Sequence, residues 1–210
     1  MGSNHFIGKV SDNKDPDGLN RVRVSKLGEE DNVTGWIPFL SPYVGDDNGL
    51  TLLPDVDSQV VVVSLNDKNS QQVAMGGIWY NDEQPPTTGE NGEADLNQDG
   101  KNNLRFLKSR SGSQLIFDDT EGQEKIQILS LDGKSRFEFL VADEIVSLTT
   151  ENDLTISAKK MMSIQAEEVE IVGKKNVNFD AEELQINAKK TMDFNADKDL
   201  GVKGSGISLN

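Results

Sequence analysis

Residues 154–173 read LTISAKKMMSIQAEEVEIVG, and they carry the clearest structural signal of the sequence. Within it, apolar residues occupy alternate positions and a small residue follows, so each unit has the form apolar-x-apolar-x-small. An alternation of period two is that of a β-strand and not of a helix. The two apolar positions recur nine times between Val146 and Leu209, a small residue closes eight of these units, and their first positions are spaced by 8, 8, 7, 8, 7, 8, 8 and 7 residues. A repeat this short and regular predicts a β-solenoid, with the small residue at each tight corner.

The alternating apolar positions are predicted to point inward and to form the core of this solenoid. The residues of this predicted core are Val146, Leu148, Leu154, Ile156, Met162, Ile164, Val169, Ile171, Val177, Phe179, Leu184, Ile186, Met192, Phe194, Leu200 and Val202. Ile207 and Leu209 continue the pattern at the far end of the chain.

Charged pairs at the predicted corners alternate in sign from one unit to the next. They are Lys159-Lys160, Glu167-Glu168, Lys174-Lys175, Glu182-Glu183 and Lys189-Lys190. Opposite charges meet only if each unit stacks on one whose repeat number differs by an odd amount. This excludes a solenoid with two strands per turn. It leaves open a single chain with three strands per turn, and a trimer in which unit n of one chain lies against unit n+1 of its neighbour.

The size of the core favours the trimer over the single chain. Nine short units give one chain only a few turns, with a thin core and two open ends. Three chains that share one prism treble the buried area and leave fewer open edges. We therefore predict a homotrimer with an intertwined β-helix.

The region before the repeats has a different sequence pattern. Between residues 6 and about 82, short apolar runs are separated by turn residues, as in Asp12–Gly18 and Gly45–Gly49. Five or six short strands at this spacing, without helical periodicity, predict a small β-barrel. A long polar run then marks a boundary. The predicted organisation is all-β, with a barrel over 1–83, a linker over 84–104 and a β-helical shaft over 105–210 whose regular repeats begin near 146.

The composition limits what the protein can do. Of the 210 residues, 35% are hydrophobic and 6% aromatic, and the last seventy contain only two aromatic residues, Phe179 and Phe194. A net charge of −15 disfavours binding to nucleic acid or adsorption to an anionic membrane surface. The absence of cysteine excludes disulfides and thiolate chemistry. We expect neither a signal peptide nor a transmembrane helix.

Several segments, taken in order, carry a resemblance to a known family. They are Gly8–Val10, Asp12–Val22, Trp36-Ile37, Ser41–Gly45, Leu53–Val56, Gly76–Asn81, Arg110–Gly122 and Glu124–Ile126, followed by the repeats. In this order the chain resembles the central spike family of contractile tails, which includes phage baseplate V-type spikes and the carboxy-terminal half of VgrG proteins. The resemblance covers nearly the whole chain. It departs at Ser113, where the family often has histidine, and it lacks the hub module that precedes the barrel in VgrG proteins.

This resemblance implies an OB-fold barrel that docks on a baseplate hub protein, followed by a trimeric β-helix that pierces a membrane transiently. It also implies a PAAR-type tip protein, which would contact Ile207 and Leu209. The expected location is the baseplate of a virion tail or an injection machine. Whether that machine is a phage, a type VI system or an extracellular injector stays open, as does the existence of a separate hub.

Candidate ligand sites in the sequence have simpler interpretations. Asp95–Gly100 resembles the first half of a calcium-binding EF-hand loop, but Phe106 stands where the bidentate Glu belongs. Asp12, Asp15 and Asp17 offer oxygen ligands, yet Asp near Pro and Gly is an ordinary turn former. His5 is the sole histidine, so neither a Ser-His-Asp triad nor a zinc site is expected. We therefore expect no catalytic residue, metal or cofactor, and not an enzyme.

Two other functions fit the sequence less well. A trimeric fibre-like adhesin or carbohydrate-binding stalk would need exposed aromatic platforms, whereas the aromatics here lie in the barrel region and on inward positions. A solenoid hydrolase would need a carboxylate cluster along a long groove, which units this short do not provide. The favoured interpretation is a mechanical spike, whose nine units at about 4.8 Å each give a shaft of roughly 40 Å.

Overall fold

The computed structural model describes residues 5–65, 71–89 and 92–208. It divides into two compact units, Met1–Thr155 and Ile156–Asn210. Throughout the described residues the fold is all-β apart from one short 3-10 helix, η1 (Gly92–Asn97). The prediction of an all-β chain is confirmed.

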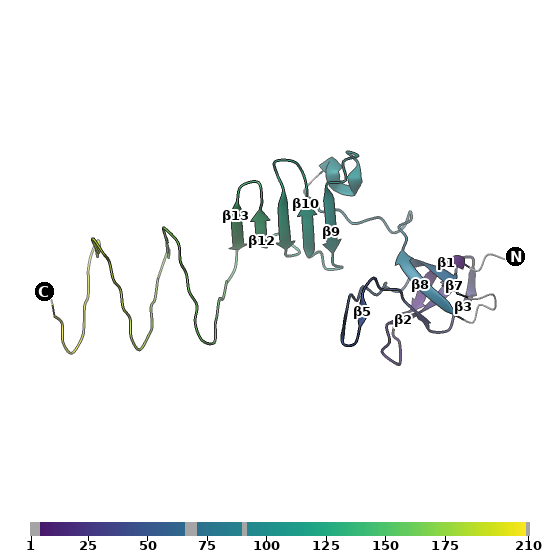
Figure 1. The fold of residues 1–210 in the computed structure, drawn as a ribbon, viewed down its shortest axis with the longest axis horizontal. Helices are drawn as coiled ribbons and strands as arrows, with labels where there is room; N and C mark the ends of the chain where they lie inside the picture. Colours follow the sequence, from purple (N-terminus) through teal and green to yellow (C-terminus); the bar gives the residue numbers. More distant parts are fainter. Residues whose placement is uncertain (1–4, 66–70, 90–91, 209–210) are drawn as a thin grey trace. The chain divides into compact units, whose positions relative to one another are not determined.

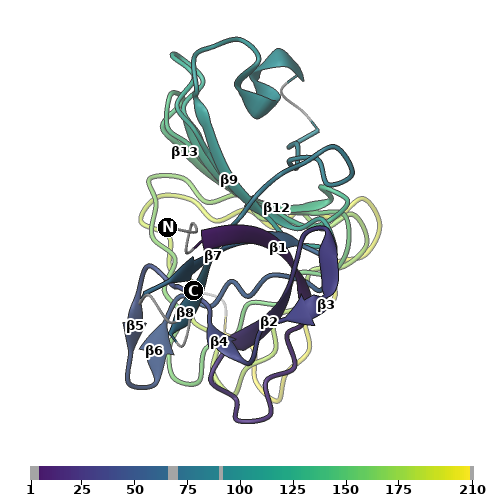
Figure 2. The same cartoon turned by 90° about the vertical axis from the view of Figure 1, so that its right-hand side faces the viewer.

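The first unit opens with a small barrel. Its strands are β1 (His5–Asp12), β2 (Arg21–Lys26), β3 (Glu29–Val33), β4 (Ile37–Pro38), β7 (Gln59–Ser64) and β8 (Gln72–Gly77). They pair in the order β3-β2-β1-β7-β8, and β4 pairs with β2. A parallel bridge between Phe39, which follows β4, and Ala74 of β8 connects these two strands, and Leu40 N donates to Ala74 O at 2.8 Å. Figure 2 shows these strands curling around a common centre, as in a closed OB-like barrel.

Branched side chains fill the barrel because apolar residues occupy alternate positions along its strands and therefore point to the same side. Val22 and Val24 on β2 and Val60 and Val62 on β7 are completely buried, as is Val10 on β1. Ile37 and Ala74 complete this cluster, and Phe6, Phe39 and Leu53 pack against it.

Gly8 on β1 allows the strands to approach one another closely. A Cβ atom at this position would lie 2.4 Å from Ser25 O and 2.5 Å from a methyl group of Val24. Any side chain at position 8 would therefore force β1 and β2 apart.

A second sheet follows in the same unit. Its strands are β9 (Leu104–Lys108), β10 (Gln114–Asp118), β11 (Lys125–Leu129), β12 (Ser135–Leu140) and β13 (Ile145–Thr150). Each strand pairs antiparallel with the next, so the sheet is a simple meander (Figure 1). Glycines with positive φ lie in three of the connections, at Gly112, Gly122 and Gly133. The first repeat unit predicted from sequence, Val146 to Thr150, lies in β13.

The second unit has a different character. Residues 156–208 are extended and turn back on themselves at regular intervals (Figure 1), and no strand pairing is assigned within that range. The bends fall at 159–160, 167, 174–175, 182, 189–190, 197–198 and 205. These are the positions at which the sequence predicts corners.

The β5–β6 hairpin, β5 (Val44–Gly45) and β6 (Asn48–Gly49), lies outside the barrel pairing. The sequence predicts only a loop there, because glycine and aspartate dominate the segment.

Candidate functional site

The apolar stripe of the repeats is the most unusual surface of the chain. All sixteen residues of the predicted core retain between 42% and 68% of their exposure, and Ile207 retains 57%. Leu209 lies outside the described residues. Soluble monomers rarely leave apolar surface of this extent open to water. Within the described residues, no other part of the chain buries this stripe.

The meander sheet presents a second apolar surface, on one of its faces. Directly opposed residues share a face, and two cross-strand rows follow from the pairing. The first row is Leu107, Leu115, Ile128, Phe137 and Leu148, and the second is Phe117, Ile126, Phe139 and Val146. Most of these side chains are exposed, from 36% for Leu115 to 62% for Val146. Both rows end in residues of the predicted core.

The opposite face of this sheet is more closed. Ile116 and Gln127, which face each other, are 1% and 3% exposed. Gln127 Nε2 donates to Glu138 Oε1 at 2.7 Å, which satisfies this polar pair within the sheet. Lys108 Nζ donates to Thr87 O at 2.8 Å and ties the preceding segment to β9. The two faces therefore differ, and the apolar one is the face left open.

The backbone of the second unit is as open as its side chains. Among the described residues from 153 to 208, no backbone-to-backbone hydrogen bond within the chain is formed. An extended backbone with unpaired N–H and C=O groups is a template for strand pairing with another chain. Exposed apolar side chains and unpaired peptide groups thus occur over the same residues, and pairing with another chain would satisfy both.

The corners carry small and charged residues, for different reasons. A Cβ atom added to Gly173 would lie 2.6 Å from Asn176 O and 2.6 Å from Val177 Cγ2, so the chain has no room for a side chain there. The lysine and glutamate pairs that follow the small residues are exposed.

The acidic cluster after β1 is a structural turn. Asp15 accepts hydrogen bonds from the backbone N–H groups of Asp17, Leu19 and Arg21. The Arg21 guanidinium also binds Asp15, at 2.6 Å, and Asp17, at 2.5 Å. Chiefly through the Arg21 hydrogen bond, the pKa of Asp15 is held well below its usual range, and that of Arg21 is raised. A single arginine thus neutralises two of the three carboxylates that the sequence offered as cation ligands, and the third, Asp12, accepts a hydrogen bond from Lys14 N at 2.9 Å.

Asp95, the first residue of the EF-hand-like segment, is also used structurally. Its carboxylate accepts hydrogen bonds from Thr88 N at 3.0 Å, Thr88 Oγ1 at 2.7 Å and Gly89 N at 3.1 Å. The side chain is only 6% exposed, and Phe106 lies in β9. Asp95 anchors the segment that the sequence predicts as a linker.

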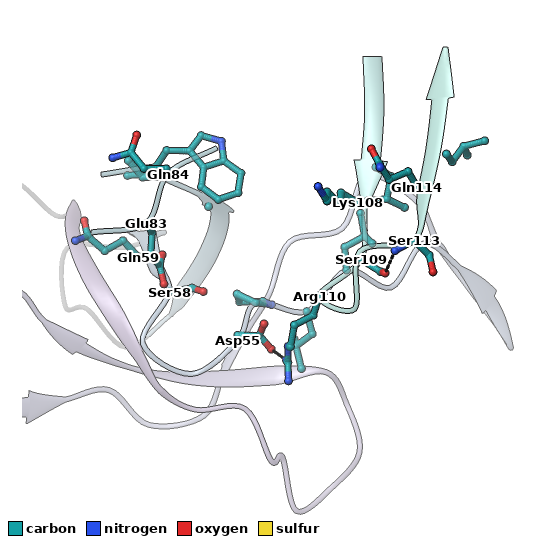
Figure 3. A pocket seen from close by; sticks show the side chains of 18 of the residues that line it. Asp55, Ser58, Gln59, Glu83, Gln84, Lys108, Ser109, Arg110, Ser113 and Gln114 are labelled. Atoms are coloured by element: carbon teal, nitrogen blue, oxygen red, sulfur yellow. Dashed lines mark hydrogen bonds and ion pairs between the residues drawn. The ribbon is translucent and has the colours of Figure 1, made fainter. Parts of the chain in front are cut away.

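Figure 3 shows a pocket in the first unit. Trp79, Leu52 and Leu115 are among its apolar lining residues. Arg110 forms an ion pair with Asp55, and Ser109 Oγ accepts a hydrogen bond from Ser113 N at 3.0 Å. Ser109 and Ser113 are thus hydrogen-bonded to each other within their own loop.

The part of the chain that the structure describes holds neither a metal cluster nor a membrane span. No group of three or more His, Cys, Asp or Glu side chains there is placed to hold a metal ion. No helix in the same residues combines the length and apolarity needed to cross a bilayer. His5 begins β1, opposite Val63.

The barrel defines the class of the protein. Residues 6–79, which span the barrel strands from Phe6 of β1 to the end of β8, match the family of type VI secretion system/phage-baseplate injector OB domains. This match over the barrel confirms the resemblance to the contractile-tail spike family that the sequence predicts, and it supports a general role as a baseplate spike associated with a baseplate complex. A search of curated proteins finds no match.

Proposed function

We propose that this chain is the shaft-bearing central spike of a contractile injection machine, and that three copies intertwine through residues 105–210 to form a rigid β-helix. Sheath contraction supplies the work, and the spike transmits force through a membrane mechanically, without catalysis. The machine is a phage tail, a type VI system or an extracellular injector.

One observation carries this proposal: the unpaired backbone and the exposed apolar stripe coincide over residues 156–208. Either feature alone would also fit a disordered segment or a ligand-binding surface. Together they fit one chain of a β-helix without its neighbours, because neighbouring chains would pair with the peptide groups and bury the apolar side chains in the same step. Disorder is disfavoured by the strict alternation of apolar residues.

A shared backbone ladder also suits the mechanical role. In an intertwined prism every strand bonds to strands of two other chains, so no chain can open by itself. Local unfolding under load would require many hydrogen bonds to break together. At one strand spacing of about 4.8 Å per unit, the regular part is roughly 40 Å long, which compares with a hydrocarbon thickness of about 30 Å.

The two ends of the spike have different partners in this proposal. The barrel docks on a hub protein of the baseplate. A conical PAAR-type protein contacts Ile207 and Leu209, as the resemblance to the spike family implies. The exposed apolar side chain of Ile207 favours such a cap.

Two measurements on the purified full chain test the proposal. Size-exclusion chromatography with light scattering should give the mass of a trimer, and the trimer should survive SDS without boiling. Hydrogen exchange should then show slow amides throughout residues 156–208, although no partner within the chain protects them. A monomeric mass with fast exchange in that range would overturn the proposal.

A further inference from the structure

The alternating corner charges form a pattern that the spike function does not require. We call the ten residues Lys159-Lys160, Glu167-Glu168, Lys174-Lys175, Glu182-Glu183 and Lys189-Lys190 the charge ladder. A solvated surface needs charge, but it does not need charge whose sign reverses at five successive corners. Each of these five pairs is uniform in sign, and the next corner, Asp197-Lys198, is mixed and lies outside the ladder.

The structure places these side chains where another chain can meet them. At each of the five pairs, one or both residues lie in a bend of the chain, and all ten side chains are exposed. In the described part of the chain none of the ten forms an ion pair within the chain. The nearest ion pair along the sequence is Lys134 with Glu151, at 3.1 Å.

The structure also separates two arrangements that charge alone leaves open. A single chain with three strands per turn would stack unit n on unit n+3 of the same chain and would bond their backbones. Residues 153–208 form no backbone hydrogen bonds among themselves in the described range. This favours the arrangement in which the complementary corner belongs to a second copy.

We propose that the charge ladder fixes the register of assembly, so that each corner of one chain lies against the next corner of its neighbour and only chains with matching ladders assemble. The occupant of this surface is a second copy of the same chain. The inference rests on the trimer of the proposed function and adds to it a rule for alignment and for selection of partners.

The register between chains must be set by the corner charges, because the apolar pattern alone does not fix it. The repeats share one pattern of apolar positions, so a slip by one unit would still place apolar residues inside the prism. That slip would, however, place lysine against lysine and glutamate against glutamate at every corner of the ladder. A slip by two units would restore the charges but would leave two units unpaired at an end.

The decisive test uses an inverted ladder, in which all six lysines of the ladder become glutamate and all four glutamates become lysine. By itself this variant keeps the alternation and should form trimers as the unmutated chain does. When the two chains are co-expressed with different tags, a trimer with one inverted chain sets like charges together in two of its three stacking contacts. Each such contact should weaken assembly roughly 1.5- to 5-fold, as for exposed ion pairs. Over several corners, mixed trimers should fall at least about tenfold below random proportions.

Native mass spectrometry of the co-expressed chains reads the result, with two differently tagged unmutated chains as the control for random mixing. Random mixing of inverted and unmutated chains would overturn the inference, and so would an inverted chain that cannot trimerise. A preference for mixed trimers would also overturn the inference. It would indicate that equal-numbered corners stack, because an inverted chain would then set opposite charges against those of an unmutated chain. A monomeric unmutated chain would instead refute the proposed function itself.

A smaller change provides a second test. Lys174→Glu with Lys175→Glu should destabilise the trimer at low salt, and the loss should shrink near 1 M NaCl, where the Debye length is about 3 Å. The control, Lys14→Glu with Lys101→Glu, makes the same change of charge at exposed positions outside the repeats. Equal stability of both variants at low salt would count against the ladder.

Discussion

Replacement of Ile156 and Ile171 by aspartate tests the core assignment directly. Each side chain is 64% exposed in the single chain, so assembly would remove from water most of the surface that folding of one chain leaves open. Full burial of an isoleucine is worth about 1.5–3 kcal/mol, and about two thirds of this, roughly 1–2 kcal/mol per side chain, is at stake on assembly. Six such side chains in a trimer amount to roughly 6–12 kcal/mol.

The introduced charges add a larger penalty. An unpaired carboxylate in an apolar interior costs several kcal/mol, and the double variant would bring six carboxylates into one prism. We therefore expect Ile156→Asp with Ile171→Asp to be monomeric in light scattering at micromolar concentration. The barrel should remain folded, because residues 6–79 form their own core.

The matched control places the same charges on the other face of the same strands. Ser157→Asp with Val172→Asp changes the positions next to the two isoleucines, and Val172 is 77% exposed. Since alternate residues of a strand point to opposite faces, these side chains should remain in water and the trimer should persist. Trimers of equal stability for both double variants would refute the assignment of the inner face.

Three further predictions concern the barrel and the tip. Gly8→Ala should lower the barrel's unfolding free energy by about 1–3 kcal/mol because of overpacking against Ser25 and Val24, whereas Gly77→Ala, which meets no atom within 4 Å, should not; thermal melts would show whether the two variants differ. The depressed pKa of Asp15 means that its ionised form stabilises the fold fully above about pH 4 and less as the pH falls toward the folded-state value, so the stability gap between the unmutated chain and Asp15→Asn should close in acid. A gap that is unchanged at low pH would contradict the role of Arg21. Ile207→Asp with Leu209→Asp should abolish capture of a PAAR protein encoded beside this gene, and equal capture in a pull-down would exclude the tip assignment.

The barrel shows how far local sequence patterns reach. Val22 and Val24 alternate with arginines, and this pattern alone predicts β2 with its buried face. The sequence does not predict β3, because its residues, Glu29 to Val33, are mostly polar and exposed, so no apolar alternation marks it. The apolar run from Trp36 to Leu40 forms only a two-residue strand, Ile37–Pro38, since proline has no N–H to contribute to a longer ladder.

The site was predictable in part. The repeat identifies Val146 and Leu148 as the start of an apolar stripe, and the structure places both on the open face of the meander sheet. The preceding members of that face, such as Leu107 and Ile128, were missed because they fall outside the repeat of seven or eight residues. Alternation within β9 and β11 was the available signal, but only strand register shows that these residues share a face.

The contrast between the two units follows from where their partners lie. In the barrel, each strand finds its partner within about seventy residues of the same chain, so one copy completes both the hydrogen bonds and the core. In the second unit, bends recur at every seventh or eighth residue, and the extended segments between them pair with nothing in the described part of the same chain. In the trimer that we propose, these segments become strands only on association, because other chains supply the backbone pairing that defines a strand. The proposed trimer also explains why the corners carry alternating charges that the barrel strands do not need. When each chain pairs with another copy of the same repeat pattern, the side chains that meet between chains must set the register.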